Sequence, residues 1–329
     1  MKRQLLSLFC GAGGLDEGFA AAGFETVFAV DNCPDAVGSF NHNAGHEIAI
    51  KRDLASLTAE KFLELIPKSA QPIGLIGGPP CQGFSRGNVN SIPNDPRNLL
   101  PYRYADLLAC ANERYGLDFF VFENVAGLLG PKHAQRLGRI VERLRGAGFK
   151  VFHHDLDAKA FSVPQRRRRL FVVGLNNKRY ADVEFEFPKG NEKLVTVGDV
   201  LRHLPTPTFF SRGLLPEQVA HHRNHWTMVP KSEKFKGGTT TDGRSFKRLK
   251  WDEVSPTVAY GHREVHVHPD GTRRLSIYEA LLLQGFRKEF ELVGSLSAQV
   301  TQVSNAVPPP LGKAIAEQIA RVIEDKQRR

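Results

Sequence analysis

Short apolar runs alternate with amphipathic stretches through the first half of this 329-residue chain, and this alternation restricts the fold more than any other feature. An apolar run of about four to eight residues is typical of a buried strand, and apolar residues spaced three and four apart are typical of a helix. Strands that alternate with helices form a parallel sheet covered on both faces. We therefore expect an α/β fold, with strands at 4–9, 25–31, 72–78, 118–124 and 169–175 and helices at 14–24, 34–43, 61–66, 102–115 and 133–148.

The chain changes character after about residue 180. Residues 189–272 are rich in Pro, Gly, Thr, Lys and His and show no long helical period. Helical spacing returns at 275–286, and an amphipathic helix near the C-terminus carries Leu311, Ile315, Ile319 and Val322 on one face. We predict a larger domain formed by residues 1–185 and 296–329, and a smaller, loop-rich, β-containing domain with its hinge at residues 186–295.

A glycine loop, CGAGG, follows the first predicted strand, and Asp31 ends the second. Glycines let the backbone approach a ligand, and an acid at this position accepts hydrogen bonds from ribose hydroxyls. Gly11 and Gly13 are present, but Asp16 stands where the dinucleotide fingerprint has its third glycine. An acid at a helix start disfavours pyrophosphate and suits a cation. S-adenosylmethionine, which carries an ammonium and a sulfonium, therefore fits better than NAD; a glycine turn with an N-capping acid is the alternative.

Cys81 directly follows Pro79 and Pro80 in the stretch GGPPCQGFSRG. The prolines stiffen the loop before the cysteine and remove two backbone donors. If a helix begins after Cys81, its N-terminus lowers the pKa of the thiol and favours the nucleophilic thiolate. An inert loop thiol is the alternative interpretation.

Charged residues flank two further predicted strands. Glu123 follows the apolar run FFVF, so partial desolvation should raise the pKa of its carboxyl and suit it to proton donation. Four arginines, 166–169, precede the strand at 169–175. In β geometry Arg167 and Arg169 point to one side, toward a site, and the other two point to phosphate or solvent. A helix-turn cap for Glu123 and a solvated basic edge for the arginines are the alternatives.

The charge balance favours a polyanionic partner. Lys and Arg total 45 against 35 Asp and Glu, a formal net charge of +10, and nucleic acid is the commonest partner of such a chain. None of the 4 cysteines forms a C-x-x-C pair, which argues against zinc, and so few cysteines fit a reducing compartment. The N-terminal apolar run is too short for a signal peptide or membrane span. We expect a cytoplasmic protein.

Eight blocks resemble, in order, the signature blocks of bacterial DNA (cytosine-5) methyltransferases, and the pairing of PPCQGFS with FENV is highly specific. The resemblance covers nearly the whole chain except roughly 180–250 and implies a Rossmann-like S-adenosylmethionine-dependent methyltransferase sheet with a smaller target-recognition domain. The blocks are LFCGAGGLDEGF, AVDN, KRDL, GGPPCQGFS, FENV, VPQRRRRL, RRLSIYEALLLQGF and QVSNAVPPPLGKAIA.

The resemblance implies a covalent mechanism on a cytosine flipped out of duplex DNA. The thiolate of Cys81 would add to C6, and C5 would then take the methyl group of S-adenosylmethionine, leaving S-adenosylhomocysteine. Glu123 would hold the N3 and N4 edge and Arg169 the O2, with Arg167 supporting the site. Loss of the C5 proton and of Cys81 would release 5-methylcytosine, and no metal is required.

The same resemblance assigns the cofactor and DNA contacts. Asp31 would take the ribose hydroxyls and Asp53 the adenine amino group, and the C-terminal block would return to the cofactor, so that the last helix packs on the first domain. The implied cofactor residues are Phe9, Gly11, Gly13, Leu15, Asp31, Asp53, Pro79, Leu100, Asn305 and Val307. The expected DNA contacts are Gln82, Ser85, Arg86, Arg97, Gln165, Arg244, Lys247, Arg248 and Arg273.

Alternating residues in EVHVH, 264–268, place His266 and His268 on one face, which suits a strand presenting polar residues better than a metal site. We expect a monomer that acts on double-stranded DNA without a metal or membrane partner. A solitary methyltransferase and one with a separately encoded restriction endonuclease both remain open. The rivals are an RNA (tRNA) cytosine-5 methyltransferase, a DNA-binding protein without catalysis and an NAD-dependent oxidoreductase. The sizeable region 185–272 argues against the RNA methyltransferase, and the filled catalytic positions argue against a DNA-binding protein without catalysis. Asp16 argues against the oxidoreductase.

Overall fold

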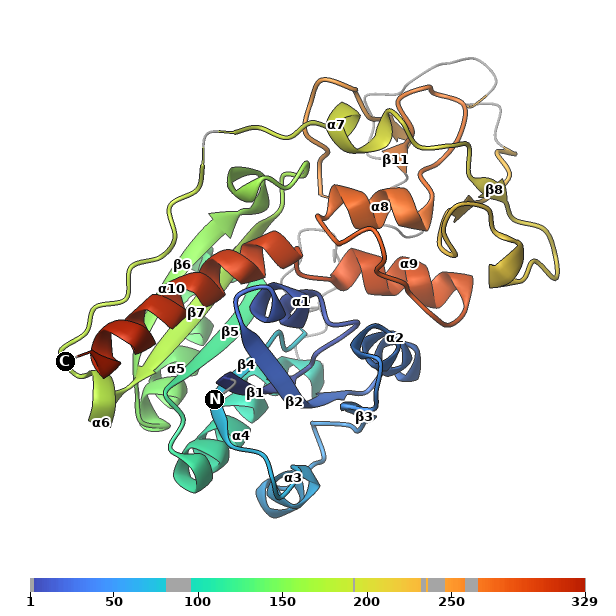
Figure 1. The fold of residues 1–329 in the computed structure, drawn as a ribbon. Helices are drawn as coiled ribbons and strands as arrows, with labels where there is room; N and C mark the ends of the chain where they lie inside the picture. The colour runs from blue at the N-terminus through green and yellow to red at the C-terminus, as the bar shows by residue number, and fades with distance from the viewer. Residues whose placement is uncertain are drawn as a thin grey trace.

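The computed structural model describes residues 3–80, 96–191, 193–231, 235, 246–257 and 266–328. Within this part of the chain, a 7-stranded sheet with the order β3-β2-β1-β4-β5-β7-β6 forms the centre of the larger domain (Figure 1). The strands are β1 (Arg3–Leu8), β2 (Phe24–Asp31), β3 (Ala49–Lys51), β4 (Pro72–Gly77), β5 (Phe119–Val125), β6 (Phe149–Asp157) and β7 (Arg168–Asn176).

The predicted parallel sheet is confirmed for the first five strands, but β7 runs antiparallel to both of its neighbours, β5 and β6. The sequence interpretation missed β3, which is only three residues long, and β6, whose apolar residues are interrupted by exposed His153 and His154. An edge strand such as β6 is buried less completely than a central one, so it lacks a continuous apolar run. The strand order reverses between β1 and β4, and a crevice at such a point is where α/β sheets bind ligands.

Helices cover both faces of the sheet, as the alternation predicts (Figure 1). Strand β5 supplies both cores, because Phe120 and Phe122 pack on one face while Phe119 and Val121 pack on the other. None of the described helices is long and apolar enough to cross a membrane. The first face carries α3 (Ala59–Leu65), α4 (Leu100–Tyr115) and α5 (Ala134–Gly146), the second carries α1 (Gly14–Ala20) and α10 (Pro309–Gln327), and α2 (Pro34–Ala44) lies beside β2 and β3.

The C-terminal helix α10 packs back on the first domain against α1, as predicted. Leu311, Ile315 and Ile319 are buried as expected, but Ile323 rather than Val322 completes the buried face. The two backbones approach so closely that a Cβ at Gly18 would lie 2.6 Å from the Lys313 nitrogen. Only glycine fits at such a contact.

The smaller region has its own hydrophobic cluster, which includes Trp226, Leu281 and Phe290. The sequence interpretation missed α9, whose Val303 packs into this cluster although residue 303 falls within the predicted larger domain. Helix α8 begins with a capping box between Ser276 and Glu279. The remaining elements are α6 (Asn177–Tyr180), α7 (Val197–Leu201), β8 (Thr208–Phe209), β9 (Trp226–Thr227), β10 (Lys247–Arg248), β11 (His266–Val267), α8 (Ile277–Leu283) and α9 (Leu296–Asn305).

The Gly18→Ala variant should unfold at lower urea concentration than the native protein. The added methyl group meets backbone atoms of α10 that have no free rotation to escape it, and such overpacking costs about 1–3 kcal/mol. Gly138→Ala in α5 is the matched control, because that glycine is exposed and its Cβ would meet no atom within 4 Å. The control should be neutral or up to about 1 kcal/mol more stable. Equal midpoints for the native protein and Gly18→Ala would refute the close packing.

Candidate active site

A cavity of about 930 Å³ opens at the carboxyl ends of β1, β4 and β5 and is bounded on the other side by residues at the end of α9. Its volume lies within the range of about 300–1,000 Å³ typical of small-molecule sites. Of the ten predicted cofactor residues, nine line it: Phe9, Gly11, Leu15, Asp31, Asp53, Pro79, Leu100, Asn305 and Val307. The tenth, Gly13, is the N-cap of α1 and has a φ of 92°, a left-handed conformation that favours glycine.

The glycine loop and Asp31 hold each other in place. The backbone nitrogen of Gly11 donates to Oδ2 of Asp31 over 2.9 Å, and that of Cys33 donates to Oδ1 over 2.9 Å. Gly11 has a φ of 55°, and among the described residues no atom beyond its two chain neighbours lies within 4 Å of the position its Cβ would take. The loop therefore leaves open space for a ligand beside a fixed carboxylate.

Asp16 adds a second acid to the wall of this cavity. Its carboxylate accepts hydrogen bonds from the hydroxyls of Thr26, over 2.8 Å, and Ser7, over 3.1 Å. Burial raises the pKa of Asp16 to about 6, and the two hydroxyl donors limit the rise. At neutral pH the charge of Asp16 is retained, which suits a cationic ligand and disfavours a pyrophosphate.

Glu123 and Arg169 meet inside the same cavity. The antiparallel register of β5 and β7 brings the start of β7 to the end of β5, and Nε of Arg169 lies 2.9 Å from Oε1 of Glu123. Burial raises the pKa of Glu123, an effect that the charges of Arg169 and Arg167 partly offset. Burial likewise lowers the pKa of Arg169, and its pairing with Glu123 opposes that shift. The site thus holds a buried carboxyl paired with a guanidinium, and the pKa of the carboxyl is raised.

The predicted alternation of the arginines is confirmed. Arg166 and Arg168 are exposed, whereas Arg167 is 1% exposed and Arg169 is half-buried in the cavity wall. Arg167 does not line the cavity; its Nη2 donates to the carbonyl of Ser304 over 2.7 Å.

The loop before the predicted nucleophile packs closely against the carboxyl of Glu123. A Cβ at Gly78 would lie 2.8 Å from Oε2 of Glu123, so a side chain at this position would displace the carboxyl. Nδ2 of Asn124 donates to the carbonyl of Pro79 over 3.1 Å, and both Pro79 and Pro80 line the cavity. The predicted nucleophile Cys81 and the predicted DNA contacts Gln82, Ser85, Arg86 and Arg244 lie outside the described residues.

Two of the predicted DNA contacts, Gln165 and Arg273, are buried in the structure. Gln165 is 0% exposed and donates from Nε2 to the carbonyl of Leu283. Arg273 is 6% exposed, and its Nη1 and Nη2 donate to the two carboxylate oxygens of buried Glu279 over 2.8 and 2.7 Å. Both side chains join elements of the protein, and neither reaches a surface where DNA can bind.

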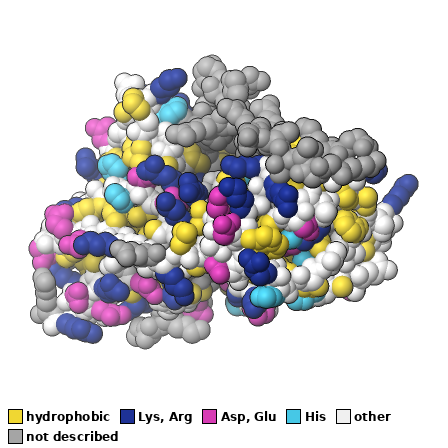
Figure 2. Space-filling model, turned by 90° about the horizontal axis from the view of Figure 1, so that it is seen from above, with side chains coloured by type: hydrophobic (Ala, Val, Ile, Leu, Met, Phe, Trp, Pro, Cys, Tyr) yellow, Lys and Arg dark blue, Asp and Glu magenta, His cyan; other side chains and the backbone are white. Residues whose placement is uncertain are grey.

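The other predicted DNA contacts within the described residues are exposed on the surface. Lys247 and Arg248 are exposed on β10, and Arg97 is exposed at the cavity. Seen from above, the molecule carries Lys and Arg side chains across the middle of the face, with acidic and hydrophobic side chains between them (Figure 2).

The expected polar face of the strand at 264–268 is wrong for His266 and His268, which are both 6% exposed and therefore buried. Trp251 packs edge-on against His268, and Nδ1 of His268 lies 2.9 Å from Oδ2 of Asp270. Within the described ranges, no group of three or more His, Cys, Asp or Glu side chains is placed to hold a metal ion.

Several residues of the cavity were missed from the sequence. Most of them are next to a predicted residue in the sequence, so the motifs that identified the predicted residues could also have identified these. Those from α9 were missed with the helix. The missed residues include Asn32, Arg52, Asn124, Thr301 and Ser304.

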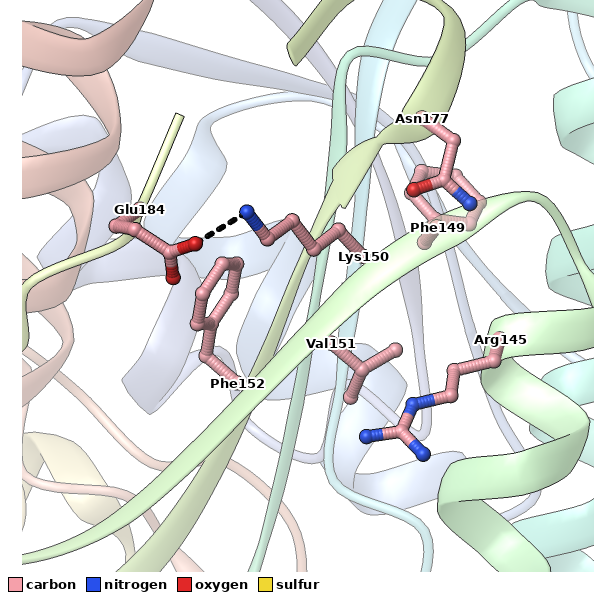
Figure 3. Close-up of a pocket in the computed structure, with 7 residues that line it drawn as sticks. All are labelled: Arg145, Phe149, Lys150, Val151, Phe152, Asn177 and Glu184. Atoms are coloured by element: carbon pink, nitrogen blue, oxygen red, sulfur yellow. Dashed lines mark hydrogen bonds and ion pairs between the residues drawn. The ribbon is translucent and has the colours of Figure 1, made fainter. Parts of the chain in front are cut away.

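A second, smaller hollow of about 510 Å³ lies at the edge strand β6, away from the predicted site (Figure 3). An ion pair between Lys150 and Glu184 spans it. No predicted site residue is among its lining residues, which are Arg145, Phe149, Lys150, Val151, Phe152, Asn177 and Glu184.

The sheet, the glycine loop and the two acids define a methyltransferase-like fold with a nucleoside-cofactor site. The family of C-5 cytosine-specific DNA methylases matches residues 3–321. The Type II methyltransferase M.MthTI of Methanothermobacter thermautotrophicus is 33% identical over 98% of this chain and 99% of its own length. M1.HphI of Haemophilus parahaemolyticus, also a Type II methyltransferase, is 32% identical over 98% of this chain and 88% of its own length.

Solved structures share the fold. A protein described as a candidate DNA modification methyltransferase from an E. coli prophage superposes with a TM-score of 0.80 at 22% identity, covering 98% of this chain and 99% of its own. The Dnmt2 methyltransferase of S. pombe superposes with a TM-score of 0.65 at 19% identity, covering 99% of both chains.

The chain belongs to the C-5 cytosine-specific DNA methylase family. It is a DNA (cytosine-5) methyltransferase, its substrate is DNA, and S-adenosylmethionine is its methyl donor. The residues of the cavity fit this cofactor: Asp31 would accept hydrogen bonds from its ribose hydroxyls, Gly11 would leave space beside it, and Asp16 would supply negative charge for its cationic groups.

The affinity for S-adenosylmethionine should fall as the pH drops below about 6. Protonation of Asp16, whose pKa is about 6, removes a negative charge that attracts the bound cation, so binding is strongest when the carboxyl is ionised. Titration calorimetry should show the dissociation constant rising up to about tenfold between pH 7 and pH 5.

Asp16→Asn should bind more weakly at pH 7 and lose this transition. S-adenosylhomocysteine, which lacks the sulfonium charge, should respond less to either change. A folded Asp16→Asn variant with native affinity and the native pH profile would show that Asp16 does not act on the cofactor charge.

Proposed function

We propose that this enzyme methylates C5 of a flipped-out cytosine within a short, specific sequence of duplex DNA, through a covalent bond between Cys81 and C6. The observation that carries the proposal is the pairing of Glu123 with Arg169 in the cavity that also contains the glycine loop, Pro79 and Pro80. Cys81 is the residue that follows Pro80 in the chain. Cofactor, acid, arginine and the loop leading to the nucleophile therefore converge on one cavity.

The enzyme must supply a nucleophile because C5 of cytosine is itself too weak a nucleophile to attack a methyl group. The thiolate of Cys81 forms a bond to C6, and the electron pair of the C5–C6 double bond moves toward N3 and activates C5. When bound, S-adenosylmethionine supplies an electrophilic methyl group. A base then removes the C5 proton, the C5–C6 double bond re-forms, and the thiolate of Cys81 leaves.

Glu123 and Arg169 act on the charge that develops in this step. A Glu123 carboxyl with a raised pKa is able to protonate N3 as the thiolate adds, which prevents an anion from building up in the buried ring. Arg169 donates to the O2 of the base from the other side of the carboxyl. Their mutual ion pair holds both groups at the cavity before the base enters.

Base flipping follows from the position of the chemistry. C6 of a stacked cytosine is shielded within a duplex, and enzymes that act on a base extrude it into a pocket. The cavity volume of about 930 Å³ leaves room for a base as well as a cofactor.

DNA recognition is assigned to the small domain, 186–295, with Lys247 and Arg248 as exposed phosphate or base contacts on β10. The names of the relatives, Type II methyltransferases, favour a role in restriction–modification with a separately encoded endonuclease. We further propose that the enzyme acts as a monomer in the cytoplasm and requires no metal.

Purified enzyme incubated with S-adenosylmethionine and unmethylated bacterial genomic DNA should produce 5-methylcytosine in one short motif. Mapping of 5-methylcytosine at single-base resolution reads the reaction and the recognised sequence together. Heat-denatured DNA and total tRNA serve as parallel substrates. Methylation of tRNA with none in duplex DNA would overturn the proposed substrate.

Cys81→Ala should abolish methylation, because no other thiol is proposed to reach C6, and should bind S-adenosylmethionine with nearly native affinity. The native enzyme should form a denaturation-resistant complex with duplex DNA that carries 5-fluorocytosine at the target, since fluorine cannot leave as a proton does. Cys110→Ala is the matched control, because this half-buried thiol on α4 is not among the residues lining the cavity. Turnover by a folded Cys81→Ala variant would overturn the covalent mechanism.

A further inference from the structure

Two buried side chains donate hydrogen bonds to the last backbone carbonyls of α9. Nη2 of Arg167 donates to the carbonyl of Ser304 over 2.7 Å, and Nε2 of Gln284 donates to the carbonyl of Val303. The final carbonyls of a helix have no donor within the helix and need one from elsewhere. A cation at this end also interacts favourably with the helix dipole. Arg167 and Gln284 therefore complete the C-terminal end of α9.

This end of α9 is part of the wall of the cofactor cavity. Ser304, Asn305 and Val307 all line it, and the backbone of Val307 packs against the glycine loop at Gly14. Arg167 itself is absent from the lining residues, yet its hydrogen bond fixes the residue that precedes Asn305 in the chain. Arg167 thus contacts the wall of the cofactor site through this hydrogen bond.

The same strand reaches the catalytic acid. Arg167 and Arg169 are alternate residues that point to the same side, and Arg169 pairs with Glu123 across 2.9 Å. Their charges are also close enough for each to lower the pKa of Glu123. A stretch of three residues consequently contacts the wall of the cofactor site at one end and the catalytic acid at the other.

The small domain sets the position of this stretch. The backbone nitrogen of Arg166 donates to the carbonyl of Ser255 over 2.8 Å, and the Ser255 nitrogen donates to the carbonyl of Pro164 over 2.9 Å. Gln165, between these contacts, donates to Leu283 at the end of α8. The residues leading into β7 therefore lie between two segments of the smaller region.

Stability alone is a poor reason for an arginine here. Arg167 is 1% exposed, its Nε has no hydrogen-bond partner among the described residues, and burial lowers the pKa of its guanidinium well below the usual value. A buried charge that is incompletely paired lowers the stability of the folded protein. An apolar residue of similar volume at such a position often gives a more stable protein.

We propose that Arg167 is a positioning residue that couples the cofactor site to the catalytic pair. Its hydrogen bond to Ser304 holds the wall at residues 305–307 in place for S-adenosylmethionine, and its strand holds Arg169 against Glu123. The link to Glu123 rests on the proposed function, whereas the link to the cofactor does not. The test therefore reads cofactor binding in the absence of DNA.

The experiment compares the dissociation constants of S-adenosylhomocysteine by titration calorimetry for the native protein and Arg167→Lys. Lysine keeps the charge but lacks the forked guanidinium, so we expect affinity to fall about tenfold although residue 167 does not touch the cofactor. Arg168→Lys, an exposed neighbour on the same strand, is the matched control and should stay within about twofold of the native value.

A double-mutant cycle with Asn305→Ala identifies the route. If Arg167 acts through the wall at 305–307, the two substitutions together should weaken binding by much less than the product of their separate effects. Native affinity in folded Arg167→Lys, or multiplicative effects in the cycle, would overturn the proposal. If Arg167→Lys fails to fold, Gln284→Met removes the neighbouring donor to Val303 and should weaken binding severalfold; unchanged affinity in that variant would equally overturn it.

Discussion

The direction of β7 is the constraint on which the active site depends. The arginines stand at the start of this strand, and in a parallel sheet the first residues of a strand lie at the edge opposite the carboxyl ends of its neighbours. Because β7 runs antiparallel to β5, its first residues lie beside the last residues of β5. Arg169 thereby reaches Glu123, and the glycine loop at the end of β1 opens into the same cavity. One reversed strand brings all three groups to one edge of the sheet.

Burial then gives these groups their chemistry. Glu123, Arg167 and Arg169 are largely shielded from water, and the electrostatic attraction between their opposite charges is stronger there than it is in solvent. The pKa of Glu123 rises because desolvation outweighs the attraction of Arg167 and Arg169. Gly78 belongs to the same arrangement, since any side chain there would push the carboxyl away. The site therefore depends on the missing side chain at Gly78 as well as on the positions of Glu123 and the arginines.

The sequence allowed prediction of the features that leave a local trace. Strands buried on both faces, such as β5, read as apolar runs, and most of the cofactor residues were found because motifs mark the ends of such strands. Edge strand β6 and helix α9 left no such trace, because their burial depends on neighbours distant in the chain.

The burial of two predicted DNA contacts, Gln165 and Arg273, was missed from the sequence for the same reason. An arginine in a basic run looks available in sequence, but Glu279, six residues later, folds back to pair with Arg273 inside the small region. The family resemblance supplied roles for Glu123 and Arg169. It did not supply the hydrogen bond from Arg167 to Ser304, which joins residues 137 positions apart.

The return of the chain to its first domain has a consequence for synthesis. Helix α10 covers the sheet beside α1, and Asn305 and Val307 complete the cofactor cavity, yet all of them follow the whole small region in sequence. A nascent chain on the ribosome exposes one apolar face of its sheet until the last helix emerges. Closure of that face is a late, long-range event, and such contacts form slowly. The wall of the cofactor cavity is therefore completed only after the small region has been synthesised.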